Sequence, residues 1–266
     1  MKSLPRLLVT GILWMSAVTG AWGQEPVAAP PLPLDEQAAE ILGDMADYLE
    51  HLGAFRVSMR AGYNVLQEDG QMLEFLERRE LSLLRPDFLR VEEYGADGTS
   101  TSLFFDGKHI TVYDATDNVF ARAPQPGGLD DAVVYYLRDL DMRLPLGMML
   151  TTRLSKELKR NLLSISYVEE SSAFADPTHH IAGRTGILDF QAWLSAKGPP
   201  LPRRIVLTYR GAPGHPQHWV EFEGWRTDLK LEAADFRFEA PDDAVQVVYS
   251  VQVPDLEDSV NYGDAP

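Results

Sequence analysis

Residues 129–161 read LDDAVVYYLRDLDMRLPLGMMLTTRLSKELKRN and decide how the rest of the chain must fold. This stretch is a long helical pattern in the middle of the sequence, with strand-like segments before and after it. Its many large apolar side chains cannot all remain in water, so one face must be buried against the strands. Pro145 interrupts the pattern and Gly147 weakens it, which predicts two or three short helices. We therefore expect a helical insert that covers the open side of a curved antiparallel sheet.

Strand-like segments flank the insert on both sides. Apolar and polar residues alternate over residues 55–65, and turn sequences at 67–70, 85–87, 95–98, 106–107 and 115–118 separate the next five segments, the last of them at 119–123. Alternation with a period of two indicates a strand with one buried face, and short turns between strands predict an antiparallel meander. Further strands are expected after the insert, at 162–168, 179–184, 187–194, 204–210 and 218–225. The expected fold class is mainly β (α+β), with a helix at residues 34–52 before the first strand.

The two ends of the chain differ from its centre. Lys2 and Arg6 precede a short apolar run, and small residues up to Gly23 predict a signal peptide, residues 1–23, that is cleaved after Gly23. Residues 24–33 are expected to be a disordered linker, 34–253 the folded domain and 254–266 a disordered acidic tail. The chain has no Cys, which fits the oxidising bacterial periplasm. We therefore expect an exported, periplasmic protein.

Charge limits the classes of partner. The net charge of −16 argues against binding to nucleic acid and against electrostatic docking on anionic lipid. The acids are expected either to form a solvated surface or to meet a basic surface of an envelope protein. Membrane contact is expected to be transient at most, and the protein is expected to be a monomer.

No sequence motif indicates catalysis, a cofactor or a metal. The chain lacks a nucleophile elbow, a zinc-protease helix motif, a phosphate loop and any thiol. His179 and His180 are neighbours in an expected strand, so their side chains point to opposite faces. His215 and His218 lie near each other in the sequence, but no third ligand accompanies them. We therefore expect no enzyme, no cofactor and no metal site.

Four short strings occur in an order that resembles a known family. They are RPDFLRV at 85–91, FDGKHITVYD at 105–114, PLPRRIV at 200–206 and FRFEAP at 236–241. This series is similar to the periplasmic lipoprotein carriers of the LolA/LolB type, and most similar to a branch of uncharacterised predicted periplasmic proteins. The resemblance covers roughly residues 34–248. It implies an unclosed antiparallel β-barrel of about eleven strands with helices on its concave side.

The resemblance does not decide the function, because this fold carries lipoproteins, moves glycolipids and serves as an envelope-stress sensor. Our first hypothesis is a periplasmic carrier for a lipid, lipoprotein or other apolar ligand. The second is a sensor or protein-interaction module without transport. A third is a structural protein with a filled core.

Alternation along the strands predicts which side chains face the helical insert. Paired Met residues in the insert suit an irregular apolar ligand. The residues expected to line a hydrophobic ligand cavity are Phe55, Val57, Met59, Tyr63, Leu83, Val91, Phe104, Val112, Leu146, Met148, Met149, Phe190, Ile205 and Leu207. The same reasoning places Val65, Leu81, Leu150, Leu188 and Phe222 on the inner face. The alternative is that these side chains fill an ordinary core.

Overall fold

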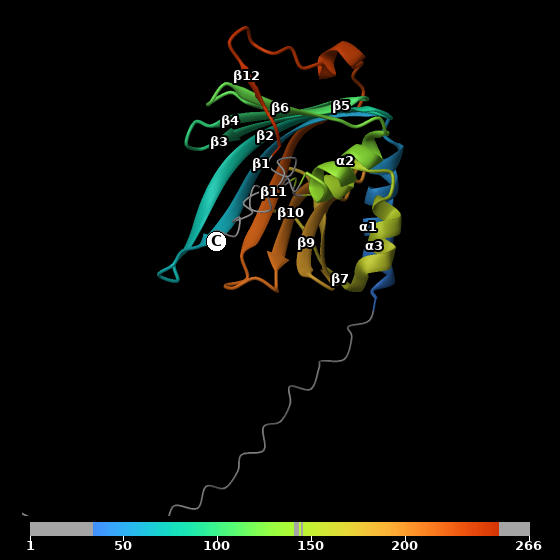
Figure 1. Ribbon diagram of the computed structural model, residues 1–266. Coiled ribbons are helices and arrows are strands. Elements are labelled where there is room, and N and C mark those ends of the chain that lie inside the picture. The colour runs from blue at the N-terminus through green and yellow to red at the C-terminus, as the bar shows by residue number, and fades with distance from the viewer. Residues whose placement is uncertain (1–33, 141–143, 145, 250–266) are drawn as a thin grey trace, which may run out of the picture. The chain divides into compact units, whose positions relative to one another are not determined.

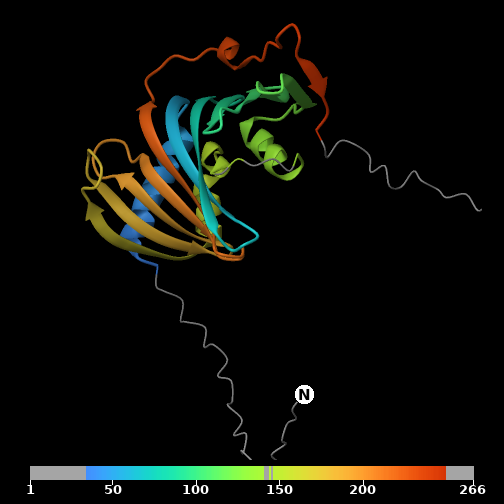
Figure 2. The ribbon, with the colours of Figure 1, turned by 90° about the vertical axis from the view of Figure 1, so that its left-hand side faces the viewer.

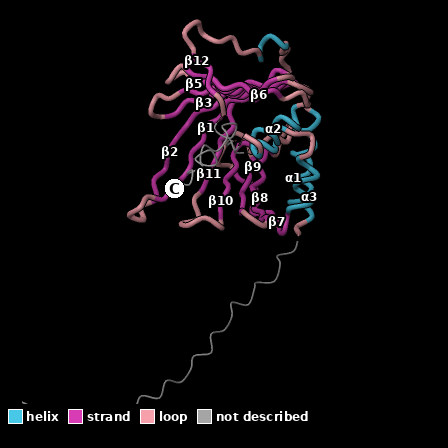
Figure 3. The backbone as a smooth tube through the Cα atoms, viewed as in Figure 1, coloured by secondary structure: helices cyan, strands magenta, loops and turns pink. Residues whose placement is uncertain are grey.

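The computed structural model describes residues 34–140, 144 and 146–249. The signal peptide, linker and acidic tail expected from the sequence, and Pro145, lie outside the described residues. The described part contains one large β-sheet with helices against one of its faces (Figure 1). Figure 3 separates the helices from the strands by colour. The mainly β fold class is confirmed.

The sheet has twelve strands and two free edges, β12 and β7. Its order is β12-β6-β5-β4-β3-β2-β1-β11-β10-β9-β8-β7, and every neighbouring pair is antiparallel except β12 and β6. Two meanders, β1 to β6 and β7 to β11, are joined by the pairing of β1 with β11. The strands are β1 (Ala54–Leu66), β2 (Met72–Leu84), β3 (Phe88–Gly95), β4 (Ser100–Asp106), β5 (His109–Asp114), β6 (Val119–Pro124), β7 (Leu162–Ser171), β8 (Thr178–Thr185), β9 (Leu188–Ser195), β10 (Pro202–Tyr209), β11 (Gln217–Arg226) and β12 (Val245–Val247).

The eleven strands expected from the sequence are all present, and β12 is added at one edge. The sheet is strongly bent and does not close on itself (Figure 2). An open, curved sheet with helices on its concave side is the architecture that the LolA-type resemblance implied. The 3-10 helix η2 (Ala233–Phe236) lies between β11 and β12.

The helices lie along the concave side of the sheet (Figures 1 and 2). Helix α1 (Glu36–His51) has buried residues at three- and four-residue spacing, and the Asp35 carboxylate accepts hydrogen bonds from the amides of Ala38 in α1 and Tyr167 in β7. The insert forms α2 (Leu129–Arg138), the 3-10 helix η1 (Gly147–Leu150) and α3 (Leu154–Asn161). The prediction of two or three short helices in place of one rod is confirmed.

Part of the convex face is covered as well. Phe236 in η2 is fully buried and packs on Phe88 in β3, with their ring centroids 5.5 Å apart. The ring of Phe238 contacts those of Phe104, Tyr113 and Phe120 on β4, β5 and β6. The C-terminal segment therefore buries apolar side chains on the side of the sheet that faces away from the helices.

Candidate ligand-binding site

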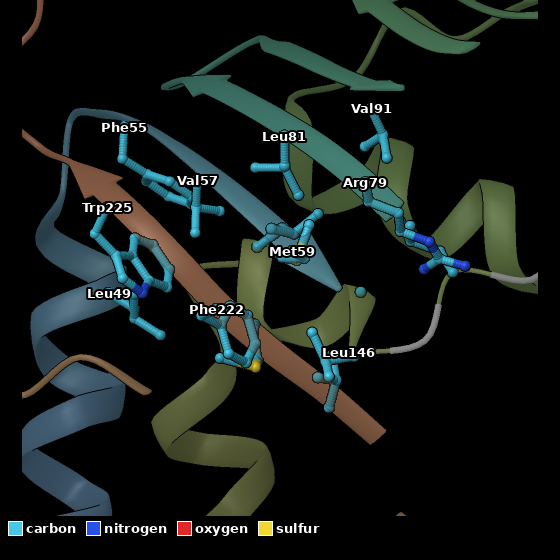
Figure 4. A pocket seen from close by; sticks show the side chains of 15 residues that line it. Leu49, Phe55, Val57, Met59, Arg79, Leu81, Val91, Leu146, Phe222 and Trp225 are labelled. Atoms are coloured by element: carbon cyan, nitrogen blue, oxygen red, sulfur yellow. The ribbon is translucent and has the colours of Figure 1, made fainter. Parts of the chain in front are cut away.

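A pocket of about 540 Å³, partly open to solvent, lies between the concave face of the sheet and η1 (Figure 4). This volume includes open solvent, and the interior space free for a water-sized sphere is only about 40 Å³, so an acyl chain could enter only if the lining side chains moved apart. Fourteen of its fifteen lining residues are apolar or glycine, and the other is Arg79. The lining residues are Leu49, Phe55, Val57, Met59, Arg79, Leu81, Val91, Leu144, Leu146, Gly147, Met149, Leu150, Val220, Phe222 and Trp225.

Strand register explains why these side chains converge. Strands β1 and β2 pair over their full length, so that Val57 lies beside Leu81 and Met59 beside Arg79. On its other side Met59 pairs with Phe222 in β11. Because alternate residues of a strand point to the same face, one row of each strand forms the floor of the pocket. Helix α1 contributes Leu49 to the wall, and the insert contributes residues of η1 and the residues just before it.

Six of the fourteen residues expected to line the cavity do line this pocket. They are Phe55, Val57, Met59, Val91, Leu146 and Met149. Leu81, Leu150 and Phe222, which alternation also placed on the inner face, line it too. The structure therefore brings together the expected residues of β1 and η1 with neighbours from β2, β3 and β11.

The other expected residues lie elsewhere, and most belong to the filled part of the core. Leu83 is completely buried, and Val112, Ile205 and Leu207 pack in the same apolar cluster. The ring of Phe190 lies directly over Gly183 of the neighbouring strand β8, where an added Cβ would meet it at 2.2 Å. These expected residues therefore belong to the packed core and not to the pocket.

Three of the expected positions need correction. Phe104 contacts Phe238 and lies on the convex side, because the C-terminal segment covers β4 there while Leu103 and Phe105 face α2. Tyr63 is 39% exposed near the β1–β2 turn, where it stacks on Phe75. Met148 belongs to η1, but the pocket is lined by its neighbours Gly147 and Met149.

The alternating pattern of the strands did not place Trp225 on the inner face, because β11 contains a bulge. Between Arg56 and Ser58 of β1, the paired residues of β11 go from Arg226 to Glu223, so β11 has one extra residue. Gly224 within this bulge has a φ of 58°, a conformation that glycine adopts without strain. The bulge shifts Trp225 to the inner face, where it contacts the rings of Phe55 and Phe222.

Charged side chains meet at the end of the pocket opposite Phe55 and Trp225 (Figure 4). Arg79 is only 7% exposed, and its terminal nitrogen lies 2.6 Å from a carboxylate oxygen of Glu77 and 2.8 Å from one of Glu93. Glu77 and Arg79 have the same parity in β2 as Leu81 and Leu83, so they face inward. Their parity could be read from the sequence, but the expected site did not include Glu77 or Arg79.

Burial shifts the proton equilibria of this cluster. Burial, and next the charge of Glu93, raise the pKa of Glu77 from its usual 4.5 to about 7, although Arg79 opposes the shift. Burial and Arg79 together lower the pKa of His218 in β11 to about 4. Burial, and less strongly Glu93, raise the pKa of Tyr136 in α2 to about 12. Burial thus favours the uncharged form of each of these three groups.

The shifted pKa of Glu77 predicts a change of stability with pH. Folded Glu77 keeps its proton up to about pH 7, whereas unfolded Glu77 loses it near 4.5, so its stabilising contribution is complete below 4.5 and is lost as pH rises through 7. Glutamine does not titrate, so the Glu77→Gln variant does not lose this free energy of unfolding, which amounts to about 1–2 kcal/mol after solvent screening. In thermal unfolding between pH 4.5 and 8, the melting temperature of Glu77→Gln should increase relative to that of the wild type as the pH rises.

The control for the loss of one carboxylate is Glu80→Gln, because Glu80 lies on the opposite face of β2 and accepts a hydrogen bond from Ser58. The opposing contribution of His218 is present in wild type and variant alike and cancels in their difference. Parallel melting curves for wild type and Glu77→Gln over this range would contradict the prediction.

The neighbouring histidines of β8, His179 and His180, make contacts within the fold. His180 stacks on Trp193 with ring centroids 4.1 Å apart, and His179 is hydrogen-bonded to the Tyr167 hydroxyl. No group of three His, Asp or Glu side chains within residues 34–249, as far as these are described, has the arrangement of a metal site. In the same part of the chain, no helix has both the length and the apolar character that a membrane span requires.

Solved structures with a similar fold come from several bacteria, all at low sequence identity. An uncharacterized conserved protein from Thermus thermophilus is 15% identical, with a TM-score of 0.46, over 80% of this chain and 99% of that one. A LolA superfamily protein from Nitrosomonas europaea is 12% identical, with a TM-score of 0.38, over 76% and 97%. A chain of the Pseudomonas aeruginosa MucA/MucB complex is 13% identical, with a TM-score of 0.42, over 77% of this chain but only 62% of that one. Similarity at this level does not indicate a shared ligand.

No curated protein sequence matches the chain. A family model described as "Predicted periplasmic protein (DUF2092)" matches residues 38–249, nearly all of the described part. This description agrees with the periplasmic location and the uncharacterised branch that the sequence indicated. The chain therefore belongs to the family of predicted periplasmic proteins DUF2092.

Proposed function

We propose that this protein binds a lipid, lipoprotein or other ligand with an acyl chain in the pocket between sheet and η1, and carries it reversibly through the periplasm. The observation that supports this most strongly is the pocket itself, whose wall is apolar except for Arg79 at one end. On one side the wall consists of β-strands, and on the other it consists of the short 3-10 helix η1, residues just before it and Leu49 of α1. A rigid floor and a cover of few residues suit a ligand that must enter and leave.

The energetics of acyl-chain binding are compatible with reversible carriage. Fourteen methylene groups would gain about 11 kcal/mol gross, at roughly 0.8 kcal/mol for each buried CH₂. Association costs of about 4–15 kcal/mol offset much of this gain. A pocket that shields only part of such a chain binds it more weakly still, so release needs no covalent step and no cofactor.

Native mass spectrometry of the protein purified from its own periplasm tests the proposal. We expect a monomer that begins at Gln24 and carries additional mass, which organic extraction identifies as a compound with an acyl chain. Repeated purification without any bound lipid, followed by failure to take up a fluorescent fatty-acid analogue, would contradict the proposal and favour a structural role.

A second candidate is a sensor or interaction module that binds the same ligand and reports it to an envelope protein. Exposed apolar side chains at the β1–β2 turn support it, since such surfaces commonly mark contact sites: Tyr63, Val65, Leu66, Phe75 and Leu76 are 38–51% exposed. A vesicle-to-vesicle transfer assay separates the candidates. A carrier moves labelled lipid between vesicles by itself, whereas a sensor binds lipid and transfers none.

A further inference from the structure

Arg79 is a buried cation with an unused donor at the end of an apolar pocket. It is only 7% exposed, and its terminal nitrogen contacts both Glu77 and Glu93. Its Nε–H group is shielded from solvent and has no hydrogen-bond acceptor among the described residues. A buried donor without an acceptor is unfavourable, and a ligand that supplied an acceptor would remove that cost. Arg79, which lines the pocket, therefore holds one unsatisfied donor covered by neighbouring atoms, and a ligand that moved these atoms apart could supply its acceptor.

The charges around Arg79 decide which acceptor fits. The guanidinium group faces two carboxylates, so the cluster has no net positive charge, whether or not Glu77 carries a proton. Tyr136 from α2 and His218 from β11 are the other titratable groups whose pKa values respond to this cluster, and neither supplies a positive charge near neutral pH. The chain as a whole is also acidic. A carboxylate or phosphate would therefore meet repulsion, whereas an uncharged carbonyl would not.

We propose that the ligand is a neutral acyl ester or amide, with its chain in the apolar part of the pocket and its carbonyl oxygen accepting a hydrogen bond from Arg79 Nε–H. This inference rests on the proposed function and narrows it to one class of ligand. The far end of the chain then lies beside Phe55 and Trp225, because these residues form the opposite end of the pocket (Figure 4). The arrangement selects for an uncharged polar group directly next to an acyl chain.

Competitive displacement of a neutral fluorophore, N-phenyl-1-naphthylamine, tests whether the pocket prefers a neutral acyl ester. Three competitors are compared at pH 8: methyl laurate, laurate and an alkane of the same length. We expect methyl laurate to bind about tenfold more tightly than the alkane, which is the usual worth of a hydrogen bond to a charged group. Laurate should bind no more tightly than the ester, because Glu77 and Glu93 repel it.

Two variants separate the role of Arg79 from general packing. The triple variant Glu77→Gln, Arg79→Met, Glu93→Gln replaces the cluster with uncharged side chains and avoids leaving a buried carboxylate without its cation. It should bind the alkane as the wild type does and lose the preference for the ester. Arg78→Met is the matched control, because Arg78 lies on the opposite face of β2 over the ring of Tyr94 and should retain the preference.

The outcomes distinguish this inference from the proposed function. If neither alkane nor ester displaces the fluorophore, both proposals are overturned. If the wild type binds ester and alkane equally, or the triple variant keeps the preference, carbonyl recognition by Arg79 is overturned and lipid binding stands. Tighter binding of laurate than of methyl laurate at pH 8 would show a site for anions and would likewise overturn the inference.

Discussion

Arg85→Met is expected to lower the free energy of unfolding by about 3 kcal/mol, because three charge-assisted hydrogen bonds are lost at once. The Arg85 guanidinium donates to the carbonyl oxygens of Leu49 and Leu52, at 3.2 and 3.1 Å, and to that of Leu150, at 2.8 Å. The first two belong to the C-terminal end of α1, where carbonyl groups lack helical partners and a positive charge is favourable. The third belongs to η1. One side chain thus ties α1, η1 and the sheet together beside the pocket.

Chemical denaturation of Arg85→Met and the wild type, with both fitted for the midpoint and the slope, measures this difference. The control is Arg153→Met. Arg153 pairs with Asp130 and Asp131 at the surface, where an ion pair contributes about 1 kcal/mol or less. Equal stability losses in the two variants would show that the buried carbonyl contacts add nothing beyond a surface charge. Burial lowers the pKa of Arg85, but the group stays charged across the usable pH range.

The sequence predicted the fold well where one face of an element is buried and the other is exposed to solvent. The alternation in β1 and the spacing of apolar residues in α1 follow directly from that asymmetry, and the insert forms short helices as expected. Phe104 shows where the reasoning fails. Both faces of β4 are covered, so Phe104 and its neighbours Leu103 and Phe105 are all buried, and alternation cannot say which of them faces the helices.

The candidate site was harder to predict than the fold, because it depends on contacts between distant segments. Trp225 reaches the pocket only through a bulge, which changes parity without leaving a clear mark in the sequence apart from Gly224. Arg85 looks like a turn residue in a short motif, and only the folded chain shows the carbonyl groups around it. Glu77 and Arg79 could have been placed on the inner face by simple parity with Leu81. They were left out of the expected site because charged residues were assumed to lie on the surface.

Met59→Trp is expected to reduce uptake of a fluorescent fatty-acid analogue by at least about tenfold. Met59 is in the middle of β1 between Arg79 and Phe222, and its side chain forms part of the pocket floor (Figure 4). Because β1 is paired along both sides, the backbone cannot retreat, and the larger indole must occupy the space that the ligand would use. Overpacking of this kind costs about 1–3 kcal/mol of stability. The loss of uptake should therefore appear in a protein that still unfolds cooperatively.

Met148→Trp provides the matched control, because it makes the same substitution in η1 at a half-buried residue that does not line the pocket. If the pocket binds the acyl chain, Met59→Trp loses uptake while Met148→Trp retains it, with both proteins folded by circular dichroism. Equal uptake by Met59→Trp and the wild type would place the ligand elsewhere on the protein. Equal loss in the two variants would mean that movement of η1, and not the volume of the pocket, limits binding. The pair thus distinguishes a ligand held against β1 from one held only by the helical insert.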